Sequence, residues 1–170
     1  MSKKGIVLIL SFIFISITGC KVNYSFTGAS IPPEVKTISI QTFPNYAPLV
    51  QPLLSQAFTE ALKDKFLAQT NLQLISRGGD LSFEGSITGY NVAPIAIQSG
   101  TDVAALTRLT ITVNIKFTNA KNEKQNFESS FSRFLDFESS KSLATVEERL
   151  IREINEQLVQ DIFNKAVVNW

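Results

Sequence analysis

The 170-residue sequence contains no histidine and a single cysteine, Cys20. Without histidine, the chain lacks the residue that most often serves as a general base and as a metal ligand. With one thiol it cannot form a disulfide within itself, so its folded domain must be stabilised by burial of apolar side chains. Neither a histidine-dependent catalytic site nor a disulfide scaffold is therefore expected.

Catalytic and phosphate-binding motifs are lacking as well. Gly85 to Gly89 read GSITG, but the serine stands second, not third, and lies within a strand pattern, which argues against a nucleophile elbow. Arg77 to Asp80 read RGGD, which we interpret as a tight turn, because a phosphate-binding loop places its glycines at the start of a helix. We expect neither an enzyme nor a cofactor-binding protein.

Charge of one sign is not in excess. The chain has 16 basic and 15 acidic residues, and removal of residues 1–19 takes two lysines, which leaves 14 basic against 15 acidic residues. A protein that binds nucleic acid obtains most of its affinity from a basic surface. A nucleic-acid partner is therefore not expected.

Long apolar runs are confined to the N-terminus. After the basic start MSKK, residues 5–18 read GIVLILSFIFISIT without a charge. This run is shorter than the roughly 20 residues that a membrane-spanning helix needs, and a basic start followed by an apolar stretch and small residues is typical of a secretory signal. We predict a signal peptide over residues 1–19.

The residues Ile17-Thr18-Gly19-Cys20 are similar to a bacterial lipobox, in which a branched apolar residue and two small residues precede the lipidated cysteine. This resemblance implies a diacylglycerol thioether on Cys20 and an acyl chain on its amine, which together anchor a protein stably. The alternative is a secreted protein with an incidental free thiol. Residues 20–33, which end in two prolines, are predicted to be a tether to a single domain over residues 34–170.

The domain begins with a predicted strand over residues 35–43, followed by an amphipathic helix within residues 48–69 whose two prolines fit near its first turn. A short strand is predicted at 72–75. Three longer strands follow, since apolar and polar residues alternate over 81–88, 108–117 and 127–137, with a polar hairpin tip at 119–124. A final helix is predicted from the capping-box spacing of Thr145 and Glu148 onward.

Two helices with one apolar face each, and a sheet with one apolar face, bury their apolar surfaces most simply by packing together. The sequence therefore predicts an α+β two-layer sandwich in the order β-α-β-β-β-β-α, with a mostly antiparallel sheet and two helices on one of its faces. The other face of the sheet is predicted to meet water or a partner.

Two sets of residues are candidates for binding. The segment 91–107 is either an ordinary long hairpin or an apolar tip that contacts a partner through Val92, Ile95 and Ile97. The second set consists of cations that we place on the polar face of the sheet or at its hairpin tip: Arg108, Lys116, Arg133, Lys121 and Lys124. These cations are either simply solvated or bind phosphates or acidic sugars of a glycolipid.

The stretch GCKVNYSFTGASIPPEVKTISIQTF, residues 19–43, resembles the LptE family of lipopolysaccharide-assembly lipoproteins, particularly its Bacteroidetes-type members, and the element order agrees with that family. The resemblance implies an outer-membrane lipoprotein on the periplasmic side that plugs the LptD β-barrel and binds lipopolysaccharide. No local motif transfers a lipid-binding role to any of the five cations. The alternative is a periplasm-facing lipoprotein that serves as a scaffold for another envelope complex.

Overall fold

The computed structural model describes residues 31–49, 51–95 and 105–168. Its elements are, in chain order, β1 (Thr37–Ile40), α2 (Leu54–Gln69), β2 (Gln73–Ile75), β3 (Leu81–Ile95), β4 (Leu106–Asn119), the short 3-10 helix η1 (Glu123–Gln125), β5 (Phe127–Glu138), α3 (Leu143–Phe163) and the π-helical turn η2 (Asn164–Val168). Over these described ranges, no helix is long and apolar enough to cross a membrane. The predicted order β-α-β-β-β-β-α is confirmed.

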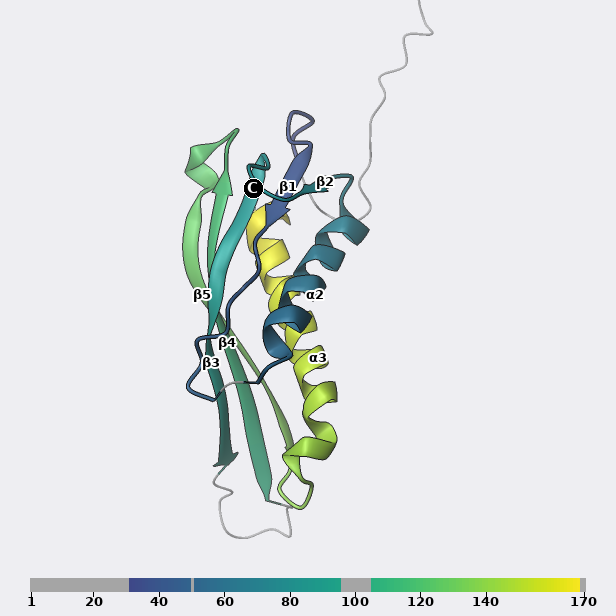
Figure 1. The fold of residues 1–170 in the computed structure, drawn as a ribbon, viewed down its shortest axis with the longest axis vertical. Helices are drawn as coiled ribbons and strands as arrows, with labels where there is room; N and C mark the ends of the chain where they lie inside the picture. Colours follow the sequence, from purple (N-terminus) through teal and green to yellow (C-terminus); the bar gives the residue numbers. More distant parts are fainter. Residues whose placement is uncertain (1–30, 50, 96–104, 169–170) are drawn as a thin grey trace, which may run out of the picture.

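The five strands form one sheet in the order β2-β1-β3-β4-β5. The long strands β3, β4 and β5 are antiparallel neighbours, whereas β1 runs parallel to both β2 and β3. Parallel neighbours need a crossover connection, and α2 supplies the one between β1 and β2. Both helices lie on the same side of the sheet (Figure 1), which confirms the predicted two-layer sandwich.

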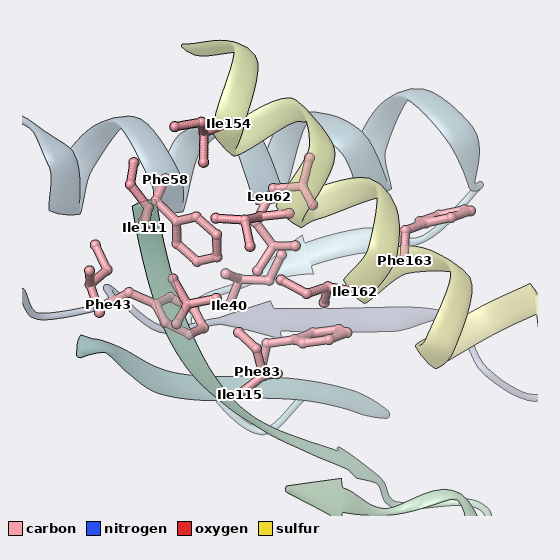
Figure 2. Packing of buried hydrophobic residues seen from close by; sticks show 14 of the residues in the cluster. Ile40, Phe43, Phe58, Leu62, Phe83, Ile111, Ile115, Ile154, Ile162 and Phe163 are labelled. Carbon is pink, nitrogen blue, oxygen red and sulfur yellow. The ribbon is translucent and has the colours of Figure 1, made fainter. Parts of the chain in front are cut away.

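The core lies between the helices and one face of the sheet (Figure 2). The alternate residues of β4 predicted to be buried are all at most 1% exposed: Leu109, Ile111, Val113, Ile115 and Phe117. Phe66 of α2 contacts both the sheet and the other helix. Its ring centroid lies 4.9 Å from that of Phe83 in β3 and 5.1 Å from that of Phe163, the last residue of α3. Such ring pairs add about 0.5–1.5 kcal/mol each to the gain from burial.

Helix α2 begins later than predicted. Its first residue is Leu54, so Pro48 and Pro52 precede the helix, and Leu49 and Leu53 are 59% and 67% exposed instead of joining the apolar stripe. A proline disfavours helical geometry in the residue before it, which explains why the helix starts only after Pro52. From Leu54 onward the predicted stripe is confirmed by the buried Leu54, Phe58, Leu62 and Phe66, whereas Ala57, which was predicted to belong to it, is exposed.

Helix α3 begins earlier than predicted. Ser142 precedes the first helical residue, and the Thr145 hydroxyl donates to the Ser142 carbonyl at 2.6 Å, so the predicted capping box at Thr145 is wrong. The apolar stripe predicted for this helix is confirmed by four fully buried side chains: Leu150, Ile154, Leu158 and Ile162.

A β-bulge between Ile87 and Gly89 shifts the register of β3 against β4. Before the bulge, odd-numbered residues such as Phe83 face the core, and after it Tyr90 and the partly buried Val92 do so. One extra residue on one strand of an antiparallel pair has this effect, because side chains alternate with a period of two. The bulge therefore decides which residues of the second half of β3 are available at the surface.

Gly85 of β3 occupies a position that tolerates no side chain. Its φ is +154°, and an added Cβ would lie 2.0 Å from the backbone oxygen of Asn114 and 2.9 Å from the ring of Phe43. We expect Gly85→Ala to lower the free energy of unfolding by about 3 kcal/mol or more, through overpacking and backbone strain together. Chemical denaturation measures the change. Gly78→Ala is the matched control: φ there is +71° with open space around the new Cβ, so about 1 kcal/mol is expected, and equal losses for both variants would contradict the steric explanation.

Candidate functional site

The face of the sheet opposite the helices, called the open face below, is polar and largely uncharged at its centre. The register of β3, β4 and β5 places side chains in rows across the three strands. The three central rows contain no charged residue: Ser86, Asn114 and Ser130; Gly89, Thr112 and Ser132; Asn91, Thr110 and Phe134. Hydroxyls within a row bond to one another, as Thr112 Oγ1 and Ser132 Oγ do at 3.0 Å. The centre of the open face thus offers hydrogen-bonding groups without net charge.

Charged residues lie in the rows on either side of this centre. In one row Lys116 stands between Glu84 and Glu128, and in another Arg108 stands beside Asp136. These two rows therefore hold three acids against two cations. The open face is not a basic surface, although two of the three cations predicted for it, Arg108 and Lys116, lie on it.

Arg108 is already engaged by its neighbours. Its Nε and Nη2 donate to the two carboxylate oxygens of Asp136 at 2.8 and 2.9 Å, and its guanidinium lies 3.6 Å from the ring centroid of Phe134. The hydrogen bonds from Arg108 lower the pKa of Asp136 and raise that of Arg108. An anion that binds Arg108 must therefore displace a carboxylate held in a bidentate pair.

Arg133 does not lie on the open face, so that expectation is wrong. It stands opposite the buried Ile111, and its Nε donates to Asp161 of α3 at 2.5 Å on the helix side of the sheet. Arg133 lies two residues from Phe131 and two from Leu135, which were predicted to face the core. Because alternate residues of a strand share a face, the sequence pattern was sufficient to place Arg133 on the helix side. The same alternation places Phe134 on the open face, where it is 47% exposed, and we had not predicted it as a surface residue.

Lys121 and Lys124 lie at the turn between β4 and β5, as predicted. The turn is organised by Asn119, whose backbone N–H donates to Asn126 Oδ1 at 2.7 Å and whose own Oδ1 accepts from the backbone N–H of Lys121 at 2.8 Å. Lys121 Nζ lies 3.1 Å from Asp80, whereas the ammonium group of Lys124 has no ion-pair partner among the described residues. Lys116 lies three residues before the end of β4 that leads into this turn, whereas Arg108 lies near the opposite end of the strand.

Asp80 holds the loop before β3, the strand β1 and the turn together. Its Oδ2 accepts from the backbone N–H of Lys36 at 2.9 Å, and from the backbone N–H and the hydroxyl of Thr37 at 3.0 and 2.9 Å, while Oδ1 meets Lys121. These hydrogen bonds, foremost the one from Lys36, hold the pKa of Asp80 well below its usual range. Lys121 is thus part of a structural network.

The predicted partner-contact residues do not form one surface. Val92 packs against the core on the helix side, whereas Ile95 stands opposite Leu106 on the open face. Ile97 lies outside the described residues, as does Cys20. Contact of Val92, Ile95 and Ile97 with a partner stays a prediction, and only Ile95 has a described position that suits it.

Ionisable groups away from the open face were also considered as a site for a metal ion, within the part of the chain that the structure describes. No group of three or more His, Cys, Asp or Glu side chains that could hold a metal ion occurs within residues 31–49, 51–95 and 105–168. The Tyr90 hydroxyl donates to Glu147 near the start of α3, and burial first, then this bond, raises the pKa of Tyr90. This pair joins the sheet to the helix. The arrangement as a whole suits non-covalent recognition by hydrogen bonds.

The chain is similar to one protein family and to several solved structures. The family model LptE, described as lipopolysaccharide-assembly, matches residues 35–166. Among solved structures, the chain resembles a minor lipoprotein from Acinetobacter baumannii (TM-score 0.51, 14% identity, 78% of this chain and 92% of that chain) and lipoprotein B from Nitrosomonas europaea (0.51, 17%, 86% and 88%). It also resembles a neuraminyllactose-binding hemagglutinin homologue from Helicobacter pylori (0.52, 9%, 84% and 89%). No curated protein matches the chain. At these identities the solved structures share the fold alone.

The Asp80 network predicts a pH-dependent contribution to stability. We expect Asp80→Asn to lower the free energy of unfolding by about 1–3 kcal/mol at pH 7, since hydrogen bonds to a charged acceptor are lost. The folded-state pKa lies below the unfolded-state value of about 4, so the carboxylate stabilises the fold above that value and the stabilisation is lost as the pH falls below it. Urea denaturation of both proteins at pH 7 and pH 3 measures the difference, which should shrink at pH 3. A difference that is constant with pH would contradict this assignment.

Proposed function

The chain belongs to the LptE family of lipopolysaccharide-assembly proteins, and from this premise we propose that it is an outer-membrane lipoprotein that fills an LptD-type β-barrel and binds lipopolysaccharide. The family match spans both helices and all five strands of the sandwich. In this proposal Cys20 carries the lipid anchor, the domain faces the periplasm, and no covalent step is performed.

The observation that carries the plug proposal is the uncharged polar centre of the open face. The interior of a large transmembrane β-barrel is polar, so a plug must present a polar surface to it. The helices already cover the apolar face of the sheet, and the central rows of hydroxyls and amides can bond to a lumen wall directly or through water. Because these rows carry no charge, their burial leaves no unpaired charge behind.

Lipopolysaccharide is proposed to meet the protein through its phosphates and sugars. Phe134 is the one large hydrophobic side chain of β3, β4 and β5 that is exposed in the described structure, so the open face has little apolar surface for acyl chains. Lysines compete with divalent ions for phosphate as mobile point charges. The ammonium groups best suited to this are those of Lys116 and Lys124, because Arg108, Lys121 and Arg133 are already paired with carboxylates.

One phosphate group cannot contact both ends of the open face. Arg108 and Lys116 are eight positions apart on β4, which corresponds to roughly 27 Å at about 3.4 Å per residue. The five predicted cations therefore do not form one site. The end of the sheet near η1 is the part at which we place the phosphate contact.

For lipopolysaccharide binding, we expect the double variant Lys116→Gln/Lys124→Gln to bind at least about fivefold more weakly than the wild type, because charge-assisted hydrogen bonds to phosphate are lost. Binding of purified, tag-immobilised domain to lipopolysaccharide measures the effect. Arg133→Gln is the matched control, since its guanidinium lies on the helix side, and it should bind like the wild type. Equal binding by the double variant, or an equal loss in Arg133→Gln, would overturn the assignment.

For the barrel partner, we expect the full-length lipidated protein, purified from detergent-solubilised envelopes, to bring with it one large β-barrel protein in a one-to-one ratio. Mass spectrometry and densitometry of the eluate measure this. Cys20→Ser should leave the membrane fraction, because the lipid attachment is lost. Recovery of other envelope proteins in place of a barrel would reject the plug and support the scaffold alternative.

A further inference from the structure

The outer edge of β5 presents a row of unpaired backbone N–H groups. The N–H of Ser139 donates to the Ala105 carbonyl at 2.8 Å, and this bond continues the β4–β5 register, in which bonded pairs recur at every second residue. Odd-numbered residues of β5 therefore bond to β4, and even-numbered residues direct their N–H groups away from the sheet: Glu128, Ser130, Ser132, Phe134, Asp136 and Glu138. Within the described part of the chain, no acceptor meets these six N–H groups.

The other exposed edges of the same sheet are protected. Strand β2 is only three residues long. On the side away from β4, β3 is paired up to Ile87, whose carbonyl accepts from the N–H of Tyr46 at 2.8 Å. In the described structure, the rest of β3 has no strand on that side, and this part contains the bulge and Pro94. By the alternation of the β3–β4 register after the bulge, Pro94 occupies an outward position, where it has no N–H to offer. Short strands, bulges and edge prolines are the devices by which proteins prevent strand addition.

Strand β5 carries no proline and no bulge over its twelve residues. It lies at one margin of the sheet, away from β1 and β2 (Figure 1). Its one charge on the helix side, Arg133, is neutralised by Asp161 and so does not oppose an added strand. The sheet thus protects two of its edges by short length, a bulge and a proline, and its longest edge, β5, has none of these three devices. The other charges of β5 lie on the open face: Glu128, Asp136 and Glu138.

Apolar side chains beside this edge are only partly covered. Phe127, Phe131 and Leu135 are half-buried on the helix side. The ammonium group of Lys165 lies 4.7 Å from the ring centroid of Phe127 and bonds to Ser129 at 2.6 Å, so a cation covers a ring where apolar atoms would normally pack. A further strand beside β5 would bury more of this row.

We infer that the outer edge of β5 is the docking site for one extended segment of the partner barrel chain, which adds to the sheet as a sixth strand. This inference rests on the proposed function. Backbone hydrogen bonds supply the affinity in such strand addition, and alternate side chains supply the specificity. The segment should carry apolar residues opposite Phe131 and Leu135, and small polar or basic residues opposite Glu128 and Asp136.

A second copy of this chain fits the edge poorly. Two copies of β5 related by a two-fold axis pair antiparallel, and residues on the same face must stand opposite each other. Two such registers align nearly the whole strand. In the register centred on Ser132, Glu128 stands opposite Asp136 of the other copy. In the register centred on Arg133, the two Arg133 residues stand opposite each other, and Glu128 stands opposite Glu138. Like charges directly opposite each other are destabilising, so a different chain is the better occupant.

Proline at an outward position of β5 tests the inference. Ser130→Pro removes an outward N–H without removing a β4–β5 hydrogen bond, and a proline is tolerated at such an edge position. Pulled down from envelopes as full-length lipidated protein, this variant should recover at least about fivefold less barrel than the wild type. Ser130→Ala is the matched control, because it keeps the N–H, and it should recover as much barrel as the wild type. Thermal unfolding checks that both variants fold.

Amide hydrogen exchange of the wild type provides an independent readout. Peptides covering 127–138 are compared by mass spectrometry between the free protein and the purified barrel complex, and the outward amides should exchange fast in the free protein and become protected in the complex. If barrel is recovered with the wild type and those amides stay unprotected, the edge inference is overturned while the proposed function stands. If no barrel is recovered with the wild type, the proposed function fails and the inference fails with it.

Discussion

The packing of α2 and α3 against a single face of the sheet is the interaction on which the rest of the structure depends. Phe66 illustrates it, because its ring contacts Phe83 of the sheet and Phe163 of the other helix at about the same separation. The buried core lies on this one side of the sheet, so the opposite face contributes little to it. Hydroxyl and amide residues can occupy it at little cost to stability, and the proposed recognition surface is thereby separated from the core.

The sequence was sufficient for the element order and for the burial pattern, because both follow from local periodicity. The apolar residues of β4 recur at every second position without interruption, and the stripe of α3 recurs at every third or fourth, so each predicted its buried face correctly. The sequence could not reveal the position of β1 between β2 and β3, since parallel neighbours leave no signature in a single strand. It also could not reveal the bulge after Ile87. In the sequence, one extra residue interrupts the alternation of apolar and polar residues in the same way as the end of a strand does.

The candidate site was less predictable than the fold, because ion pairs join residues that are distant in sequence. Five cations were recognised from the sequence, but their partners Asp136, Asp161 and Asp80 could be assigned only once the strands and helices were assembled. The pairing changes the physical character of the surface. In the proposed function, recognition on the open face would depend on directional hydrogen bonds at short range. Long-range attraction of an anionic lipid would contribute little, because nearby carboxylates cancel the field of the cations.

The Asp80 network also bears on the order in which the chain assembles. Its partners Lys36 and Thr37 lie 44 and 43 residues before it, and Lys121 follows it in the sequence by 41 residues. Each contact closes a long loop, and such closures become favourable only after other contacts have brought the segments together. We therefore expect the carboxylate to complete its bonds late in folding, after the sheet has joined β1 to β3 and β3 to β4. Interactions that form late chiefly slow unfolding, so this one side chain contributes to the lifetime of the folded state more than to the speed of reaching it.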